Sequence, residues 1–597
     1  MTDLERELRF QLYELLDTEA LLLRPRYADH DRAVFDATLD TARQLAAEYY
    51  APHNHKADNN EPTFDGQRVH LIEETKLAWD AFAQNGFLAA QHDYADGGSQ
   101  LPEVLLRACM AHFNAANIAT VAYSFLSIGA ANLVKSFADL DLREHFLPPM
   151  LEGRFSGTMA LTEPGQGSAL GDLRTSARQA ADGSYRVFGQ KMFISGGDHE
   201  LTENIVHMVL ARIEGSPAGV KGISLFLVPK FLLNEDGSIG PRNDVALAGL
   251  LHKMGYRNTT STVLSFGEGE GAHGYLVGQA GQGLAYMFQM MNEARIGVGL
   301  GAASLAYQSF QDALAYARER PQGRLPGAKD PATPQVRIVE HADVRRLLLQ
   351  QKVYAEGSLA LCLYASSLVE DAHTATTETD RRDAGELLDL LTPMVKTWPS
   401  RYGLLASEIG VQVLGGAGYT REYPLEQNYR DNRLNPIHEG TEGIQALDLL
   451  GRKLGPKGGA GYGLFLAAVE RTLDEVSGTS DCAELADLLA AALDILQQVT
   501  GSLQEQVTVD ATRGLANATA YLDLFGRVVV GWLWLRQALV ASRAFANGST
   551  GDQRHYYQGK LQAARYFMDW ELAPLASIGK LLISGNTASF AMQDAWF

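Results

Sequence analysis

The stretch MALTEPGQGS, residues 159–168, decides the fold, because the pattern of apolar residues is helical before it and typical of β-strands after it. Over residues 4–151 apolar side chains recur at every third or fourth position, which predicts amphipathic helices. Beyond residue 168 come short runs rich in Val, Ile, Phe and Thr, at 185–194, 205–212, 223–229 and 262–266. Gly, Asp and Asn separate these runs, so they predict β-strands, which we expect to be antiparallel.

Helical periodicity returns at Gly283 and continues through 290–320, 341–369 and 384–414, segments long enough to form a bundle. The run GPKGGAGYG, residues 455–463, predicts a joint before a further helical unit. A chain of 597 residues has room for about three or four domains. We therefore expect an α+β fold that is mostly α, with four parts. They are an N-terminal helical domain with an extension (1–157), a middle β domain (158–275), a helical bundle (276–454) and an additional C-terminal helical domain (464–597).

The composition excludes several classes of protein. Hydrophobic residues make up 46% of the chain and charged residues 20%, which is the balance of a globular protein. The formal net charge of −20 disfavours nucleic acid and anionic lipid as partners. Three widely spaced cysteines without a CxxC pair favour a reducing cytoplasm. The N-terminus lacks the apolar core of a secretory signal, and the apolar run 528–535 is too short to span a bilayer, so we expect no transmembrane segment.

Two segments carry residues suited to chemistry. The loop 159–168 combines hydroxyl groups with two glycines and a proline, and it can either approach a planar ring and a phosphate or form a turn between domains. The segment 437–445, IHEGTEGIQ, places Glu439 before Gly440 and Thr441 at the start of a helix that we expect to end near Leu454. A carboxylate there can act as a base, or it can complement the positive end of that helix.

Three other patterns give weaker evidence about function. GVGLGA at 297–302 matches a dinucleotide-binding pattern, but no strand precedes it, so we interpret it as close helix packing. His53 and His55 have no partners at metal-ligand spacing and no HExxH is present, so we predict no metal site. The absence of GxSxG argues against a serine hydrolase of that type.

Eight motifs occur in one order: MALTEPGQGS, GQKMFISGG, KMGY, MNEARIGVG, ARERPQGR, QVLGGAGYTREYP, YRDNR and IHEGTEGIQ. Together they closely resemble the acyl-CoA dehydrogenase family over about residues 21–454. The chain length, RFQLYELLD near the N-terminus and AMQDAWF at the C-terminus resemble the bacterial subgroup of about 600 residues with an additional C-terminal helical domain. That subgroup includes 3-methylmercaptopropionyl-CoA and fatty acyl-CoA dehydrogenases. The resemblance implies that family's fold, an FAD cofactor and oxidation of an acyl-CoA between its α and β carbons.

The resemblance also implies roles for single residues. Glu439 matches the family's base, in HEGT where many members have YEGT, and the β hydride would pass to flavin N5. The residues implied to bind FAD are Met159, Leu161, Thr162, Gly167, Ser168, Phe193, Ser195, Arg320, Gln322, Gln412, Gly416 and Thr441. Of these, Phe193 stands where Trp is common, Ser195 where Thr is common, and the set Arg320, Gln322, Gln412 and Gly416 would hold the ADP half across a subunit interface. The residues implied to contact acyl-CoA are Ser168, Asn292, Arg295 and Gly440.

Two departures, Asn292 in place of an acid and Gly443 in place of a larger polar residue, put the contacts at those positions in doubt. Residues 464–597 carry nine Lys and Arg against fourteen Asp and Glu, unlike the basic C-terminal region of the family's DNA-binding offshoot. The resemblance implies an electron-transfer flavoprotein as electron acceptor, with an oxygen-using acyl-CoA oxidase as the alternative. We expect a homodimer, and a medium to long acyl chain or a 3-methylmercaptopropionyl group as substrate.

Overall fold

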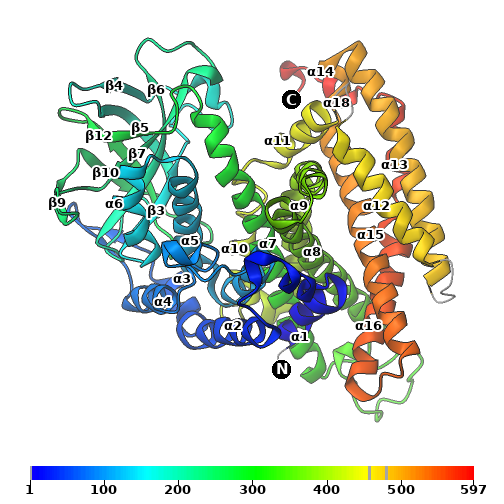
Figure 1. Ribbon diagram of the computed structural model, residues 1–597. Coiled ribbons are helices and arrows are strands. Elements are labelled where there is room, and N and C mark those ends of the chain that lie inside the picture. The colour runs from blue at the N-terminus through cyan, green and yellow to red at the C-terminus, as the bar shows by residue number, and fades with distance from the viewer. Residues whose placement is uncertain (1–2, 455–458, 477–481) are drawn as a thin grey trace. The chain divides into compact units, whose positions relative to one another are not determined.

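The computed structural model describes residues 3–454, 459–476 and 482–597 of the chain (Figure 1). It divides into two compact units, which are described one at a time. One unit comprises residues 33–297, and the other comprises the first 32 residues together with residues 298–597. The first 32 residues belong to the unit of the C-terminal helices, not to the unit 33–297. The predicted N-terminal domain of residues 1–157 stays a prediction.

Helices form the first part of the unit 33–297. Their apolar stripes face inward as the spacing predicts; in α2 (Arg32–Leu45), for example, Phe35, Leu39 and Ala42 are buried. The longest is α5 (Glu103–Phe137), which bends at Asn117, where the Asn117 carboxamide caps the second half by accepting from Thr120 N at 3.0 Å. The remaining elements are α3 (Asn54–Asn59), β1 (Thr63–Phe64), β2 (Val69–His70), α4 (Glu73–Gln84) and α6 (Leu140–Leu151).

A mixed eight-stranded sheet forms the rest of this unit. Its strand order is β10-β11-β5-β12-β7-β6-β3, with β4 pairing to β5 and β6. The strands are β3 (Phe155–Ala160), β4 (Ser176–Gln179), β5 (Tyr185–Ser195), β6 (Asn204–Ile213), β7 (Ile223–Pro229), β10 (Val245–Leu250), β11 (Ser261–Phe266) and β12 (Ala272–Val277). A separate hairpin joins β8 (Phe231–Leu233) to β9 (Ile239–Arg242).

The prediction of purely antiparallel strands is wrong at two pairs. Strand β6 runs parallel to both β3 and β4, and neither is joined to β6 by a hairpin, because β5 comes between them and β6 along the chain. Successive residues of β6 face opposite sides, so Met208 packs with α5 and α6 while Val209 packs in the core on the other face. Both faces are covered, which explains why β6 and β7 read as nearly continuous apolar runs.

The second unit is helical. Its bundle consists of the part of α7 (Gly283–Glu319) from residue 298 onward, α8 (Ala342–Thr374) and α9 (Glu378–Leu414), close to the three predicted segments. After η10 (Gly415–Tyr419) come α10 (Leu425–Asn432), α11 (Glu442–Leu447) and the π-helix η11 (Asp448–Lys453). The C-terminal helices are α12 (Ala460–Val476), α13 (Ala483–Val509), α14 (Ala511–Gly514), α15 (Ala518–Ala546), α16 (Gly551–Tyr566), α17 (Leu575–Ile583) and α18 (Ala588–Ala591). The predicted joint at 455–463 falls partly outside the described residues.

A buried polar cluster joins the N-terminus to the C-terminal helices of this unit. Helix α1 (Asp3–Arg9) carries Glu7, whose carboxylate accepts from Lys560 Nζ of α16 at 2.6 Å. The same ammonium donates to Glu356 of α8 at 2.8 Å and to Gln537 of α15 at 2.9 Å. Lys560 and Glu7 are completely buried, so each charge is compensated by the others rather than by water.

Two helices are long and apolar enough to cross a membrane by length and composition. They are Glu103–Phe137 and Ala518–Ala546, and 78% and 83% of their most apolar windows are buried inside the protein. The run 528–535 therefore belongs to a longer apolar helix than the sequence suggested. Burial of this extent is typical of core helices, which pass the same test.

Replacing Lys560 with Met would leave the buried carboxylate of Glu7 without the ammonium group that donates to it, whereas Glu356 would keep the ammonium group of Lys352. We expect the free energy of unfolding to fall by about 3–5 kcal/mol, the usual cost of breaking a buried ion pair on one side only. Urea unfolding followed by circular dichroism measures the change. The matched control is Arg565→Met on the same helix, where the ion pairs to Glu484 and Asp569 are exposed; an equal loss in both variants would contradict the expectation.

Candidate active site

The loop that follows β3 presents main chain and hydroxyl groups at the surface of the unit 33–297. Met159, Leu161 and Thr162 are half-buried, whereas Gly167 and Ser168 are exposed. A Cβ atom built at Gly167 meets nothing within 4 Å, so the space beside this main chain is open. The loop can thus receive a ligand close to its backbone.

A buried ion pair holds this loop in place. Lys191 of β5 is fully buried, and its ammonium donates to Glu163 at 2.9 Å and to the carbonyl of Leu161 at 3.0 Å. Burial would raise the pKa of Glu163, but the Lys191 charge and the hydrogen bonds from Thr175 and Arg174 outweigh it and lower that pKa. Burial also lowers the pKa of Lys191 to about 8. Sequence reasoning missed this pair; a lysine within a predicted strand was the available signal.

A β-bulge in β5 turns Phe193 outward beside the loop. The register with β11 shifts so that two residues, Met192 and Phe193, lie opposite one. Phe193 adopts φ +58°, which is strained for a bulky side chain, and 61% of it is exposed. Met192 N donates to the Thr162 carbonyl at 2.9 Å, so the loop and the bulge are joined. Thr162, Phe193 and the half-buried Ser195 therefore lie in one region of this unit.

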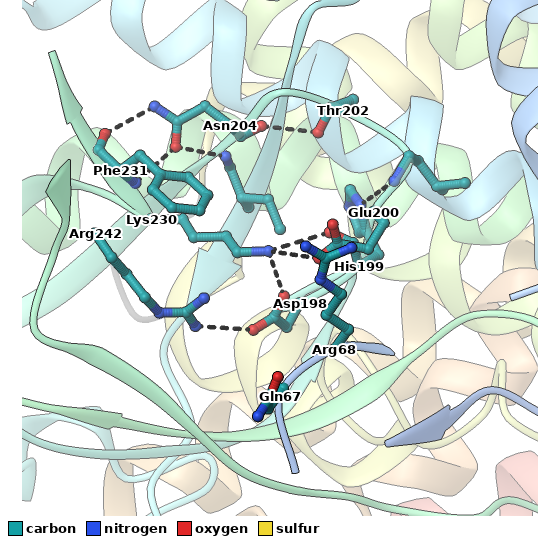
Figure 2. Close-up of polar contacts among 12 residues, drawn as sticks. Gln67, Arg68, Asp198, His199, Glu200, Thr202, Asn204, Lys230, Phe231 and Arg242 are labelled. Carbon is teal, nitrogen blue, oxygen red and sulfur yellow. Dashed lines mark hydrogen bonds and ion pairs between the residues drawn. The ribbon is translucent and has the colours of Figure 1, made fainter. Parts of the chain in front are cut away.

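The segment after Ser195 is pinned by a second buried lysine (Figure 2). Lys230 donates to Asp198 at 2.6 Å and to the carbonyl of His199 at 3.2 Å. Asn204 holds the chain on the other side by donating to the carbonyl of Phe231 at 2.8 Å. Burial, with a smaller contribution from Lys230, lowers the pKa of His199 to about 3, so this imidazole is neutral at physiological pH.

Helix α7 carries two of the four residues predicted to contact acyl-CoA, Asn292 and Arg295. Arg295 is buried and its guanidinium donates to Asn292 at 3.5 Å. Between them lies Glu293, which sequence reasoning did not single out. Asn132 of α5 donates to its carboxylate at 2.8 Å. Burial is the main cause that raises the pKa of Glu293 to about 7; the hydrogen bond from Asn132 opposes this rise, and the charge of Glu103 adds to it.

In the other unit, Glu439 lies on a tight turn between α10 and α11. Its φ is +53° and that of Gly440 is +87°, so two successive residues are left-handed. Glu439 is half-buried, and Thr441 is exposed at the N-cap of α11 without a side-chain capping bond. Helix α11 passes into η11, which ends at Lys453, close to the predicted end at Leu454.

Two buried side chains hold this turn through its carbonyl groups. Gln445 Nε2 donates to the carbonyl of Glu439 at 2.9 Å, and Lys396 Nζ of α9 donates to the carbonyl of Gly440 at 2.7 Å. Both side chains are completely buried. Burial and the charge of Lys396 lower the pKa of His438 to about 3, and His438 Nε2 lies 3.1 Å from Asn435 Oδ1. Neither Lys396 nor Gln445 was predicted to belong to a site.

The four residues expected to hold an ADP group are not all brought together. Arg320 lines a surface cavity of about 420 Å³ with Tyr423 and Pro424. Gln322 is fixed nearby, since its carbonyl accepts from His341 Nε2 at 2.8 Å. Gln412 ends α9 and Gly416 follows it in η10, and within the described residues neither lines that cavity.

Comparison with known proteins identifies the family. The chain is 35% identical, over 99% of its own length and 99% of the relative's, to the broad-specificity linear acyl-CoA dehydrogenase FadE5 of Mycobacterium tuberculosis. It is 34% identical to the 3-methylmercaptopropionyl-CoA dehydrogenase of Ruegeria pomeroyi, over 94% of each chain. The chain belongs to the acyl-CoA dehydrogenase family. As the motifs predicted, it is thus a member of a family of FAD-dependent oxidoreductases.

Family models and a solved structure agree with this membership. Residues 35–154, 158–268 and 281–454 match the N-terminal, middle and C-terminal domains of acyl-CoA dehydrogenases, and residues 465–593 match a domain described as acetyl-CoA dehydrogenase C-terminal like. The acyl-CoA dehydrogenase of Bacillus anthracis, solved with FAD, has the same fold, with a TM-score of 0.74 at 19% identity over 94% of this chain and 90% of that one. The predicted acyl-CoA dehydrogenase fold with an additional C-terminal helical region is confirmed.

Replacing Glu293 with Gln should change how stability depends on pH. A carboxyl group whose pKa is raised from 4.5 to about 7 binds more protons when folded, so the wild-type protein loses stability as pH rises through that window. The glutamine variant lacks this loss. We expect it to gain about 1–3 kcal/mol relative to wild type between pH 4.5 and pH 8.

Urea unfolding at the two pH values checks this expectation. The matched control is Glu144→Gln, at an exposed position of α6, for which we expect the same effect on stability at both pH values. If the stability of the wild-type protein and that of the Glu293→Gln variant changed by the same amount between the two pH values, this expectation would be contradicted.

Proposed function

We propose that this protein oxidises a fatty acyl-CoA to the trans-2-enoyl-CoA with bound FAD, and that Glu439 is the base. The observation that carries the proposal is the turn 439–440. A carboxylate-bearing residue is held there in a left-handed backbone conformation by Lys396 and Gln445. Strain of this kind persists only where the surrounding structure maintains it, and it is common at active sites.

The chemistry requires such a carboxylate. The α C–H of a thioester is a weak acid, so its removal needs a positioned base and donors to the carbonyl oxygen. Glu439 would accept the α proton, and its own main-chain N–H would donate to the thioester oxygen, as the family resemblance implies. Positioning of a general base contributes about 10² to 10⁴ in rate. In the alternative role, Glu439 only complements the N-terminus of α11. That role does not explain why Lys396 and Gln445 both donate to carbonyl groups of the turn.

The surface near Thr162 and Phe193 fits the flavin ring. An exposed aromatic side chain on a bulge, two hydroxyl groups and open main chain are the features that a planar, hydrogen-bonding ring requires. FAD, when bound, supplies the acceptor for the β hydride. We propose that Met159, Leu161, Thr162, Phe193 and Ser195 hold its ring, and that Gly167, Ser168, Arg320, Gln322, Gln412, Gly416 and Thr441 hold the rest.

We propose a linear acyl thioester as substrate, with Ser168, Asn292, Arg295 and Gly440 as its contacts. FadE5 is named for broad specificity toward linear acyl-CoA, which supports this choice, whereas a 3-methylmercaptopropionyl group stays the alternative. The prediction of a medium to long chain remains untested. We further propose an electron-transfer flavoprotein as acceptor, a homodimer and a cytoplasmic location; light scattering of the purified protein measures the mass of the assembly.

The proposed base is tested by Glu439→Gln. We expect the variant to retain FAD but to lose flavin bleaching when it is titrated anaerobically with acyl-CoA, because a carboxamide cannot accept the α proton. The control is Glu442→Gln, which removes the next carboxylate along the chain and should still bleach. Normal bleaching in Glu439→Gln would refute the assignment. Release of peroxide during aerobic turnover would identify an oxidase instead.

Lys396 is a positioning residue in this scheme. We expect Lys396→Met to slow flavin reduction by about 10- to 100-fold, because a displacement of about 1 Å in a catalytic group costs that much. FAD content and the KM for acyl-CoA should change little, and Lys396→Arg should recover part of the rate, because it restores a donor. Stopped-flow absorbance measures the rate. Loss of FAD, or a rise in KM with the rate unchanged, would contradict this role.

A further inference from the structure

His199 lies in the segment that connects β5 to β6, shortly after Ser195, and only 1% of it is exposed. Both nitrogens of its imidazole ring take part in hydrogen bonds. Leu201 N donates to Nδ1 at 3.2 Å, and Nε2 lies 3.2 Å from Oγ of Ser156 in β3. Because Nδ1 accepts from Leu201, the ring proton is on Nε2, which donates to Ser156.

Two hydroxyl groups continue this chain of hydrogen bonds in one direction. Thr202 donates to the carbonyl of Asn204 at 2.8 Å (Figure 2), so its oxygen, which lies 3.1 Å from Ser156 Oγ, accepts from Ser156. Ser156 in turn accepts from His199. Each proton therefore has one position, and hydrogen bonds arranged in this way strengthen one another. The chain requires a neutral imidazole, which burial ensures by lowering the pKa of His199.

The main chain and the ring of His199 are held on several sides. Lys230 donates to its carbonyl and to Asp198 (Figure 2), and its ring contacts Tyr123 edge-to-face with the centroids 5.1 Å apart. Before Asp198 the chain passes close to β11, since a Cβ atom built at Gly197 would lie 2.1 Å from a hydroxyl oxygen of that strand. The path from the end of β5 to His199 is therefore tightly constrained.

The bond between His199 and Ser156 joins the two segments that are proposed to flank the flavin ring. One of them, 159–162, follows Ser156 along the chain, and the other, 193–195, precedes His199. Their opposite ends are joined by the main-chain bond from Met192 described above. Strands β3 and β5 are not neighbours in the order of the described sheet, so contacts other than strand pairing fix the distance between the two segments.

We propose that His199 is a positioning residue for the flavin, and that its bond to Ser156 sets the spacing of the two segments between which the ring binds. The inference rests on the proposed function and deepens it, because it assigns a residue that prepares the cofactor site. His199 acts through Ser195 and Met159, not through contact with FAD. Without the bond the two segments can move apart, and binding of FAD must then restore their spacing at a cost in affinity.

Two substitutions separate the two hydrogen bonds of the ring. His199→Asn keeps an acceptor near the position of Nδ1 for Leu201 but removes the donor to Ser156. His199→Gln places an amide donor near the position of Nε2, so it keeps the bond to Ser156 and loses the acceptor for Leu201. We therefore expect FAD to dissociate faster from His199→Asn, whereas His199→Gln should stay close to wild type.

The rate is measured on the purified holoenzyme, by the recovery of flavin fluorescence after dilution. We expect His199→Asn to raise it about tenfold, the size expected for one lost buried hydrogen bond. Ser156→Ala should raise it as much. The double variant should lose FAD no faster than either single variant, because both changes remove the same bond.

The matched control is Ser224→Ala in β7. Ser224 is fully buried, and its hydroxyl accepts from Gly281 N at 2.9 Å, outside the residues proposed to bind FAD or substrate. Its loss should lower the free energy of unfolding in urea about as much as Ser156→Ala does, because each removes one buried hydrogen bond. The rate of FAD dissociation from Ser224→Ala should equal that of wild type.

The outcomes separate this inference from the proposed function. If the wild-type protein binds no FAD, the proposed function fails. If wild type holds FAD but His199→Asn releases it no faster, or Ser224→Ala and His199→Gln release it as fast as His199→Asn, only the inference fails. Additive effects in the double variant would also overturn it. Should His199→Asn not fold, Ser156→Ala carries the same expectation, and an unchanged rate there overturns the inference.

Discussion

The hydrogen bond from a buried ammonium group to a main-chain carbonyl recurs at each segment on which the candidate site depends. Lys191 donates to Leu161, Lys230 to His199 and Lys396 to Gly440. Main-chain carbonyls in loops lack the partners that helices and sheets supply, so each such bond satisfies one of them and fixes the loop. Burying an ammonium group costs free energy unless several acceptors surround it. The chain around each lysine must therefore place acceptors near the ammonium group.

These anchors allow the backbone to keep conformations that it would otherwise avoid. Phe193 and Glu439 are the two left-handed residues other than glycine among those expected to act in the chemistry, and each is next to a segment that a lysine holds. Each costs of order 1–3 kcal/mol, which rigid surroundings offset. The bulge at Phe193 exposes an aromatic ring on a partly buried strand, and the turn at Glu439 breaks the backbone just before α11. Both are ways of presenting a side chain that regular structure would bury or misdirect.

Periodicity in the sequence predicted the elements well, because local spacing determines which faces are apolar. The helices α8 and α9 and the strand β5 begin and end near the predicted limits. Strand order did not follow, because the parallel pairs of β6 depend on packing between distant segments. Motifs singled out Thr162, Phe193 and Glu439 but not their supports: Lys191 pairs with a residue 28 positions away, and Lys396 with one 44 positions away. The environment of Glu293 depends on Asn132, 161 positions earlier. In the sequence, nothing distinguishes Glu293, between Asn292 and Arg295, from an ordinary surface acid. Only the fold brings Asn132 to its carboxylate.

The bond between Glu7 and Lys560 links residues 553 positions apart, which matters for the order in which the molecule is made. A ribosome adds roughly 5–20 residues per second, so the beginning of the chain waits roughly half a minute to two minutes for its partner to emerge. During that interval residues 33–297 can already collapse around their own core. Helix α1, by contrast, cannot pair Glu7 with Lys560 until α16 has emerged. The unit of residues 1–32 and 298–597 can thus be completed only after the unit 33–297, which it encloses in sequence.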